Sequence, residues 1–429
     1  MGEIGYFWKN VDNQLPAEAG LVQHQLSHSK PMKYIGLPRP SYPLGGIQKS
    51  VTSTLTCPFF SIFGTNNCDM GQKTTDSGLD YLPPLREKVE SLNVLRQVSR
   101  SSAALAELKG IAKIIPNQSM LVNAIVLQEA KDSSEIENII TTHDELYKAL
   151  TINRLNYSVA TKEVVNYRKA IFYGFDLIKR QGFLKVNDII SIQHLLVDNT
   201  AGIRKIPGTV LKNDKTGEVV YTPPQDYDEI LDLLSNFIEH FNQVDDDLSP
   251  LIRLAILHHQ FESIHPFYDG NGRTGRILNI LFLIMNDLID VPILYLSSYI
   301  IDNKPEYYRL LNKTNRLGEW DELIIFMLKA VEKTSIDTIA RISNIKDYLD
   351  KSIIEVQTMS PKIYRKEFVE LLFEQPYCKI EYVVDRLDVE RKAASRYLKE
   401  MESIGLLQSQ RIGRETLYIN KGLIDILKQ

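Results

Sequence analysis

Cysteine and tryptophan are scarce in this chain of 429 residues. It contains two tryptophans and three cysteines, Cys57, Cys68 and Cys378. Three scattered cysteines are too few for a disulfide framework, and no CxxC pair is present to hold a structural zinc ion. Because chains without disulfides are typical of reducing compartments, we expect a cytoplasmic protein.

Long apolar runs are also missing. The longest, ILNILFLIM at residues 277–285, is interrupted by Asn279 and is about half as long as a membrane-spanning helix. The first residues include Glu3 and are not followed by an apolar run, so they do not resemble a signal peptide. We therefore expect no membrane segment.

Neither sign of charge dominates the sequence. The 50 Lys and Arg residues against 54 Asp and Glu give a net charge of -4, which argues against attraction of the whole protein to nucleic acid or anionic lipid. A local basic face remains compatible with this balance. With 44% hydrophobic and 24% charged residues the composition is that of a globular protein, and the length predicts about three domains.

The chain divides into four regions. Residues 1–78 are rich in Gly, Pro, Ser, Thr and Asn and lack periodicity, so we expect either little ordered structure or a non-native extension there. Apolar residues then recur at spacings of three and four through residues 79–195 and 196–345, which predicts a mainly α fold. Residues 355–429 show three helical patterns and two short strands, the order of a winged helix-turn-helix domain.

One segment interrupts the helical pattern. In residues 206–224 two β-prone runs flank the turn KNDKTG, and a proline lies near each end. This arrangement predicts a β-hairpin that protrudes from the helices. Taken alone, it could be an ordinary surface hairpin.

Residues 265–276 read HPFYDGNGRTGR and lie between two helical patterns. The proline that follows His265 disfavours helical geometry, so this histidine should end the first helix at the mouth of a loop. Gly270 and Gly272 permit a tight turn, and the next helix, expected to start near Thr274, presents free N–H groups. The segment therefore predicts a phosphate-binding loop.

Charged residues add chemistry to this loop. Arg273 and Arg276 place positive charge on the first turn of the next helix, where phosphate oxygens would lie. Asp269 supplies a carboxylate beside the polyphosphate, a common way to hold Mg²⁺, and His265 can accept a proton from an incoming hydroxyl. Each residue alone could be a helix end, a turn former or a surface charge, but their combination in one short segment indicates catalysis.

The segment resembles the signature of Fic domain proteins, HxFx(D/E)GNGRxxR, and matches every fixed position. The resemblance implies transfer of AMP from ATP to a hydroxyl group of a target protein, called AMPylation, with pyrophosphate leaving. It extends from about residue 81 to 425, where segments such as PPLREKVE, IPNQ and GIRKIPGTV are similar to the longer bacterial Fic proteins. It implies that residues 196–345 form the catalytic core.

By this resemblance His265 is the general base and Asp269 holds Mg²⁺. The residues implied to bind the nucleotide are Gly270, Asn271, Gly272, Arg273, Thr274, Gly275 and Arg276. The first three form an anion hole, and the two arginines hold the β- and γ-phosphates. Family members that phosphorylate carry lysine at the position of Gly272, so the glycine favours AMP transfer.

An inhibitory motif is implied upstream. SSEIEN at residues 133–138 resembles the family pattern (S/T)xxxE(G/N), whose fixed positions are Ser133, Glu137 and Asn138. The resemblance implies an inhibitory helix over about residues 133–149 and a pairing of Glu137 with Arg276 that blocks the γ-phosphate site. The alternative is a capping box that begins at Ser134, in which the glutamate only bonds to the start of a helix.

Two further segments resemble parts of the family. The hairpin of residues 206–224 is similar to the flap, whose edge adds a strand of the target protein and brings its hydroxyl to the histidine. The flap residues implied to lie nearest the nucleotide are Pro207, Gly208, Thr209 and Val210. PEYYRLLNKTNRLGEW resembles the segment that closes over adenosine and places Tyr307, Tyr308 and Asn315 near the base, with core packing as the alternative for the tyrosines.

The C-terminal region carries basic residues on one helical pattern and on the last hairpin. They are Arg391, Lys392, Arg396, Lys399, Arg411 and Arg414. This layout could meet a DNA groove and its phosphates. Alternatively, the charges are solvated on a domain that serves for packing or dimerisation.

Our functional hypothesis is a protein adenylyltransferase, inhibited by Glu137, that uses ATP and Mg²⁺ to modify Ser, Thr or Tyr hydroxyls of target proteins and of itself. A homodimer is a further expectation, since dimers are common among such proteins. The alternative is a nucleotide-sensing, DNA-binding transcription regulator. The intact His265 argues against this alternative, because a sensor needs no general base.

Overall fold

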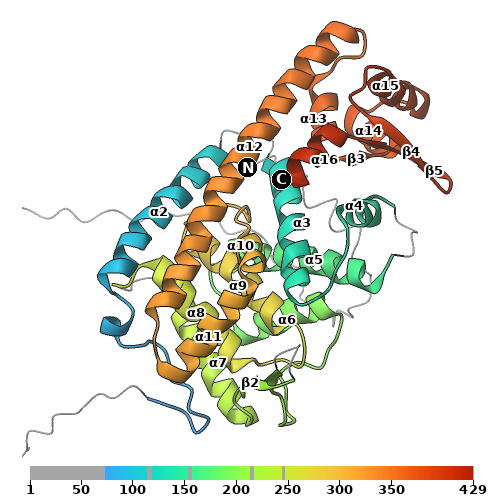
Figure 1. Ribbon diagram of the computed structural model, residues 1–429. Helices are drawn as coiled ribbons and strands as arrows, with labels where there is room; N and C mark the ends of the chain where they lie inside the picture. Colours follow the sequence, from blue (N-terminus) through green and yellow to red (C-terminus); the bar gives the residue numbers. More distant parts are fainter. Residues whose placement is uncertain (1–72, 114–117, 153–156, 213–216, 244–246, 429) are drawn as a thin grey trace, which may run out of the picture. The chain divides into compact units, whose positions relative to one another are not determined.

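The computed structural model describes residues 73–113, 118–152, 157–212, 217–243 and 247–428. The expectation for residues 1–78 therefore lies almost entirely outside the described residues. The described ranges belong to one compact unit that is mainly helical, as predicted (Figure 1). None of the helices in these ranges is long and apolar enough to cross a membrane.

A short 3-10 helix, η1 (Arg86–Lys88), precedes the first α-helix. The helices that surround the motif segment are α2 (Leu92–Ala112), α3 (Gln118–Ile136), α4 (His143–Thr151), α5 (Val159–Gln181), α6 (Val186–Val197), α7 (Tyr227–Asn242), α8 (Pro250–Ile264), α9 (Asn271–Met285), α10 (Leu296–Asp302), α11 (Lys304–Leu317) and α12 (Asp321–Met359). The two long helices α2 and α12 run side by side along this core (Figure 1).

Helices α8 and α9 form the centre of the core. Nearly every residue of both helices is buried, as expected for helices that other elements surround on all sides. Aromatic side chains join them to α7: the ring centroids of Phe237 and Phe261 are 5.6 Å apart, and those of Phe241 and Phe282 are 5.4 Å apart. The loop between α8 and α9 carries the motif segment, so the most buried part of the protein supports it.

Helix α5 crosses α9 at a very short distance. A Cβ atom added to Gly174 of α5 would lie 2.5 Å from Leu281 Cδ1 of α9 and 3.3 Å from Ile192 Cδ1 of α6. Both contacted side chains are fully buried. Glycine is therefore required at this crossing because there is no room for a side chain. Its backbone conformation would not by itself demand glycine.

The predicted hairpin is present. Strands β1 (Leu211–Lys212) and β2 (Val219–Tyr221) pair antiparallel, with Leu211 opposite Tyr221. The middle of the KNDKTG turn lies outside the described residues. The strands are shorter than the β-prone runs, because only a few residues of this protruding segment find a partner.

The inhibitory motif lies at a helix end, and the expected helix over residues 133–149 is wrong in its bounds. Helix α3 ends at Ile136, and α4 starts only at His143. Asn138 adopts a left-handed backbone with φ of 63°, the N–H of Ile139 donates to the carbonyl of Ser134, and that of Asn138 donates to the carbonyl of Glu135. These two bonds form a Schellman motif, the usual way for a helix to end.

The capping-box alternative at Ser134 is also wrong, because this serine lies inside the last turn of α3. Its hydroxyl donates to the carbonyl of Ala130, four residues back. Glu137 is instead the residue that caps the C-terminus of α3, where its side chain is free to reach another element.

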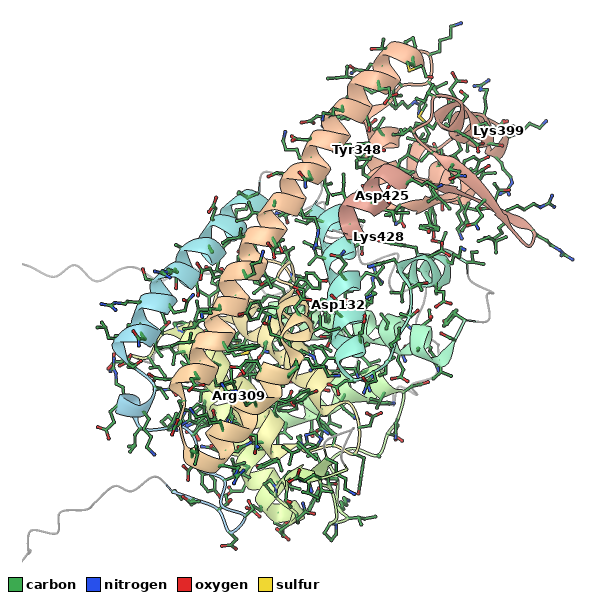
Figure 2. The ribbon with its side chains drawn as sticks, in the orientation of Figure 1. Asp132, Arg309, Tyr348, Lys399, Asp425 and Lys428 are labelled. Carbon is green, nitrogen blue, oxygen red and sulfur yellow. The ribbon has the colours of Figure 1, made fainter. Side chains whose placement is uncertain are left out.

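The C-terminal region contains the expected three helices and a hairpin, and in addition a short strand and a closing helix. Its elements are α13 (Lys366–Glu374), β3 (Tyr377–Cys378), α14 (Ile380–Leu387), α15 (Arg391–Ser403), β4 (Gln408–Ile412), β5 (Glu415–Ile419) and α16 (Lys421–Lys428). The sheet order is β3-β5-β4. Helix α16 packs against α12, with Asp425 and Lys428 of α16 and Tyr348 of α12 labelled in Figure 2. The Tyr348 hydroxyl donates to Asn420. Helix α12 continues to Met359, so the expected domain boundary between residues 345 and 355 lies within one continuous helix.

We predict that Gly174→Ala destabilises the protein by about 1–3 kcal/mol, because the added methyl group overpacks the crossing of α5 and α9. Urea unfolding followed by circular dichroism measures this change. The matched control is Gly110→Ala on α2, where an added Cβ would have no neighbour within 4 Å. This control should stabilise the protein by about 0.4–1 kcal/mol, and an equal effect of both substitutions would contradict the packing described for α5 and α9.

Candidate active site

The motif segment forms a loop that starts at a left-handed histidine. Helix α8 ends at Ile264, and His265 has φ of 48° and ψ of 58°. The loop ends at Gly270, also left-handed, where a Cβ atom would lie 2.7 Å from Val197 Cγ1 of α6. Helix α9 begins at Asn271, three residues earlier than the expected start near Thr274. Gly270 is the N-cap of this helix, and Gly272 lies in its first turn.

The side chain of Asn271 holds the loop closed. Its Nδ2 donates to the carbonyl of Phe267 at 2.8 Å, and its Oδ1 accepts the N–H of Phe267 at 2.8 Å. The amide group implied to form part of the anion hole is therefore occupied by the loop itself. The N–H groups at the start of α9 remain the donors that face outward from the loop.

Arg204 fastens the end of α8 to the hairpin, a role that the sequence analysis missed. Its Nε donates to the carbonyl of His265 at 2.8 Å, and its Nη2 donates to the carbonyls of Ile264 and Pro224. The side chain is almost completely buried. Carbonyls at a helix C-terminus lack partners within the helix, so a buried guanidinium is well suited to them.

His265 is neutral over a wide pH range. The pKa of its ring is lowered to about 4, mainly by burial. The charge of Arg204 acts in the same direction, whereas the Glu262 backbone and the carboxylates of Glu137 and Asp269 act against it. A neutral imidazole at the end of α8 can accept a proton at pH 7, as the predicted general base must. The structure therefore places His265 in a state that suits this role.

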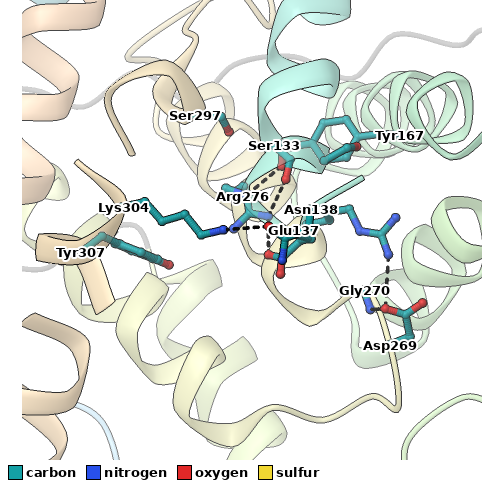
Figure 3. A network of polar contacts seen from close by, with 12 residues as sticks. Ser133, Glu137, Asn138, Tyr167, Asp269, Gly270, Arg276, Ser297, Lys304 and Tyr307 are labelled. Carbon is teal, nitrogen blue, oxygen red and sulfur yellow. Dashed lines mark hydrogen bonds and ion pairs between the residues drawn. The ribbon is translucent and has the colours of Figure 1, made fainter. Parts of the chain in front are cut away.

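Arg276 and Glu137 form the expected ion pair. Nη2 of Arg276 donates to Glu137 Oε1 at 2.7 Å, while Ser133 accepts from Nε at 2.7 Å and from Nη2 at 2.9 Å (Figure 3). Burial alone would raise the pKa of Glu137, but Arg276 beside it holds that pKa below its usual value. The fixed residues Ser133 and Glu137 of the inhibitory motif thus both contact the second arginine of the signature.

Gly272 allows this ion pair to form. A Cβ atom at position 272 would collide with the Glu137 carboxylate and would lie 3.0 Å from Arg276 Nη1. Any larger residue would therefore have to displace the glutamate or the arginine. The same position was expected to discriminate AMP transfer from phosphorylation.

Arg273 has two acidic partners. Nη1 donates to Glu163 Oε2 of α5 at 2.6 Å, and Nη2 donates to Asp269 Oδ1 at 3.2 Å. The pairing with Glu163 was not predicted from the sequence, because a single glutamate in an amphipathic helix resembles an ordinary surface charge. Asp269 also accepts the N–H of Gly270 at 2.6 Å (Figure 3).

Asp269 fits the predicted role of a Mg²⁺ ligand. Its side chain is 68% exposed, and it pairs with the buried Arg273, which could bind polyphosphate. The described residues contain no cluster of three or more His, Cys, Asp or Glu side chains that could hold a metal alone. This is the arrangement that Mg²⁺ accepts, since it binds through one or two carboxylates together with substrate phosphates.

Two other carboxyl groups lie near Arg276 and were not predicted. Glu129 of α3 is buried and accepts hydrogen bonds from Ser297 and from the Tyr167 hydroxyl. Burial raises the pKa of Glu129 to about 6 and that of Glu262 to about 7, in both cases against the opposing charge of Arg276. Sequence periodicity offers no sign of them, because both occupy positions that look like polar helix faces.

The residues expected to lie near the adenine base differ in how deeply they are buried. Tyr307 is 1% exposed and its hydroxyl contacts His258 Nε2 at 2.8 Å, so it belongs to the core, whereas Tyr308 is 42% exposed. Asn315 accepts the hydroxyl of Ser263 at 2.9 Å, near the end of α8. His258 and His259 of α8 are both buried in the core.

The flap begins beside the catalytic loop. The hydroxyl of Tyr268 accepts the N–H groups of Lys205 and Ile206, and the N–H of Gly208 donates to Gln225 Oε1 at 2.6 Å. Residues 207–210, the implied nucleotide contacts, therefore lie in the segment that leads from this contact into strand β1. No described contact joins them directly to Arg273 or Arg276.

Three family descriptions match the sequence. They are "Fic/DOC family N-terminal" at residues 95–176, "Fic/DOC family" at residues 183–283, and "Protein adenylyltransferase SoFic-like, C-terminal domain" at residues 348–423. The chain belongs to the Fic/DOC family. Its motif loop and its inhibitory motif both lie inside the two Fic/DOC matches.

Curated relatives share part of this Fic/DOC protein. A probable protein adenylyltransferase of Aquifex aeolicus is 27% identical over 183 residues, which are 40% of this chain and 52% of the relative. The protein adenylyltransferase Fic of Nematostella vectensis is 26% identical over 176 residues, 40% of this chain and 38% of the relative. The chain thus spans between about a third and a half of these relatives.

A solved structure has the same fold. The Fic family protein from Desulfovibrio desulfuricans G20 is 18% identical, with a TM-score of 0.52 over 79% of this chain and 98% of that chain. This similarity extends the Fic fold to most of the described helices.

We predict that the ring of His265 titrates near pH 4 and not near 6.5, because burial disfavours its charged form. Since the pKa is lower in the folded state, the ring stays neutral as the pH falls from 7 to 5. Carbon-13 NMR of labelled histidine measures this, with His265→Gln to assign the resonance. A midpoint between pH 6 and 7 would contradict the burial described here.

Proposed function

We propose that the protein transfers AMP from ATP to Ser, Thr or Tyr hydroxyls of proteins. The observation that carries this proposal is a neutral His265 at the end of α8, separated by one short loop from two buried arginines at the start of α9, Arg273 and Arg276. The names of the curated relatives support it. Because the chain spans only part of those relatives, the activity of the whole protein is part of the proposal.

The geometry suggests a direct transfer. Nε2 or Nδ1 of His265 accepts the proton of the target hydroxyl, and the hydroxyl oxygen bonds to the α-phosphorus of ATP. The bond from this phosphorus to the oxygen bridging the α- and β-phosphates breaks, and pyrophosphate leaves. Arg273 and Arg276 stabilise the charge on the leaving group, and the N–H groups of α9 face the α-phosphate.

Asp269 would hold Mg²⁺ together with the phosphates. When bound, the ion supplies positive charge that offsets the charge developing on the departing pyrophosphate. Asp269 is the exposed carboxylate of the loop, so it can reach an ion that also contacts solvent.

Glu137 would inhibit this reaction. Its carboxylate occupies the Arg276 guanidinium that the γ-phosphate needs, and the two anions cannot bind the same donors together. ATP could then bind only in a pose in which the γ-phosphate lies elsewhere. Release requires the end of α3 to move away from α9.

The remaining expectations stay predictions. They comprise addition of a target strand to the flap, self-modification, DNA binding by the C-terminal region, a homodimer, and a cytoplasmic location. Self-modification is favoured physically by the high effective concentration of a tethered hydroxyl. The alternative hypothesis of a DNA-binding nucleotide sensor is not favoured, because the relatives that match this chain are named adenylyltransferases.

We predict that Glu137→Gly increases AMP transfer about ten- to a hundredfold. A hydrogen bond to a charged group contributes about 1.5–3 kcal/mol, and about 1.4 kcal/mol corresponds to a factor of ten. The assay incubates the protein with Mg²⁺ and α-labelled ATP and measures label covalently attached to protein.

Two variants make this assay decisive. Glu135→Gln changes a glutamate two residues away that pairs with Lys131 instead of Arg276 and keeps the helix propensity of the last turn of α3, so the rate should stay low. Adding His265→Ala to Glu137→Gly should abolish the label. Label from γ-labelled ATP alone would indicate a kinase, and equal rates for Glu137→Gly and the unchanged protein would contradict inhibition by Glu137.

A further inference from the structure

Arg273 has its nearest carboxylate on a helix far away in the sequence. Its Nη1 lies 2.6 Å from Glu163 Oε2, and its Nη2 lies 3.2 Å from Asp269 Oδ1. The Arg273 side chain is 2% exposed, and those of Glu163 and Asp269 are 28% and 68% exposed. The shorter contact is thus made with the more buried of the two carboxylates.

This pair resembles the inhibitory pair of Glu137 and Arg276, but the two glutamates are anchored differently. Glu137 caps the end of α3, after its last helical residue. Glu163 lies in the second turn of α5, beside Val164, which is fully buried. Helix α5 packs against α9, the helix that carries Arg273. Opening of the end of α3 therefore leaves the backbones that carry Glu163 and Arg273 in place when Glu137 leaves Arg276.

Arg273 retains donors for a ligand. Its Nε is buried and has no hydrogen-bond partner among the described residues. A buried N–H without a partner is unfavourable unless a ligand completes it. Glu163 and Asp269 take one donor from each terminal nitrogen, so Nε and the second protons of Nη1 and Nη2 remain for phosphate oxygens.

The contact between Arg273 and Asp269 is long for oppositely charged groups, which usually approach to about 2.7–2.9 Å. The opposing pull of Glu163 accounts for this length, because it holds the guanidinium from the other side. If Glu163 lost its charge, Asp269 would be the remaining carboxylate on Arg273 among the described residues. The arginine would then close on Asp269 and compete there with a cation.

We propose that Glu163 is a positioning residue that keeps Arg273 directed at the phosphates and prevents it from neutralising Asp269. Asp269 thereby stays available to Mg²⁺. The inference rests on the proposed function of this site, since it assigns the partner of the leaving-group arginine. It differs from inhibition: a second inhibitory glutamate would slow the reaction, whereas Glu163 supports it.

The test uses the full chain with Glu137→Gly as the parent, so that AMP transfer is measurable. Glu163→Gln removes the charge at nearly constant shape, and Glu163→Asp keeps it. Glu107→Gln, at an exposed position on α2, is the matched control. The rate of AMP transfer is measured against Mg²⁺ concentration. Binding is measured separately by the electron paramagnetic resonance of Mn²⁺ with a non-hydrolysable ATP analogue, in proteins that also carry His265→Ala.

We expect Glu163→Gln to raise the Mg²⁺ concentration for half-maximal rate about tenfold and to weaken Mn²⁺ binding similarly, as is usual when the partner of a metal-site residue is lost. Glu163→Asp should restore much of both, and Glu107→Gln should change neither. A faster reaction in Glu163→Gln would instead make Glu163 a second inhibitory residue and overturn the proposal. Unchanged metal dependence and unchanged Mn²⁺ binding would overturn it as well.

Failure of the proposed function is recognised separately. A parent that binds Mn²⁺ and nucleotide but transfers no AMP contradicts the proposed reaction, while its Mn²⁺ affinity with and without Glu163→Gln still decides the role of Glu163. A parent that binds no Mn²⁺ with the analogue overturns the role of Asp269 and with it this inference. Unfolding temperatures of all variants identify any that lose metal binding because they fail to fold.

Discussion

Arg273 and Arg276 bring two positive charges into the protein interior at the start of α9, where their side chains are 2% and 1% exposed. A buried charge without a counter-ion is strongly destabilising, so a phosphate site of this kind needs other anions while it is empty. Glu163 of α5 and Glu137 of α3 supply them. The proposed inhibition would therefore also solve a folding problem, because the same Glu137 carboxylate neutralises a guanidinium that would otherwise be buried alone.

A third buried cation links the end of α8 to the hairpin. Arg204 donates to carbonyls of Ile264 and His265 at the end of α8 and to Pro224 at the far end of the hairpin. The flap and the histidine are consequently held by one side chain. In the proposed reaction, a target strand that pairs with the flap would be positioned relative to the same group that accepts its proton.

Local sequence was sufficient wherever the site is contiguous. HPFYDGNGRTGR predicted a loop between two helices, and the resemblance of SSEIEN to an inhibitory motif correctly paired Glu137 with Arg276. Glu163 and Arg204 could not be found in this way, because their partners are 110 and 61 residues distant and only the packing of α5 and α8 brings them together. The helix bounds at residues 133–149 failed for a different reason: Asn138 is compatible with a helix interior, and only its left-handed backbone reveals that α3 has ended.

That left-handed residue explains the last position of the inhibitory motif in physical terms. Glycine and asparagine are the residues that adopt this conformation at lowest cost, so the pattern E(G/N) describes a glutamate followed by a helix terminator. The terminal turn of a helix opens far more often than its interior, and local opening takes place in microseconds to seconds. Withdrawal of Glu137 would thus require the fraying of one turn and not the unfolding of a domain. The resting activity of the protein would then be set by how often the end of α3 opens, so that a partner binding this short segment could adjust the activity gradually.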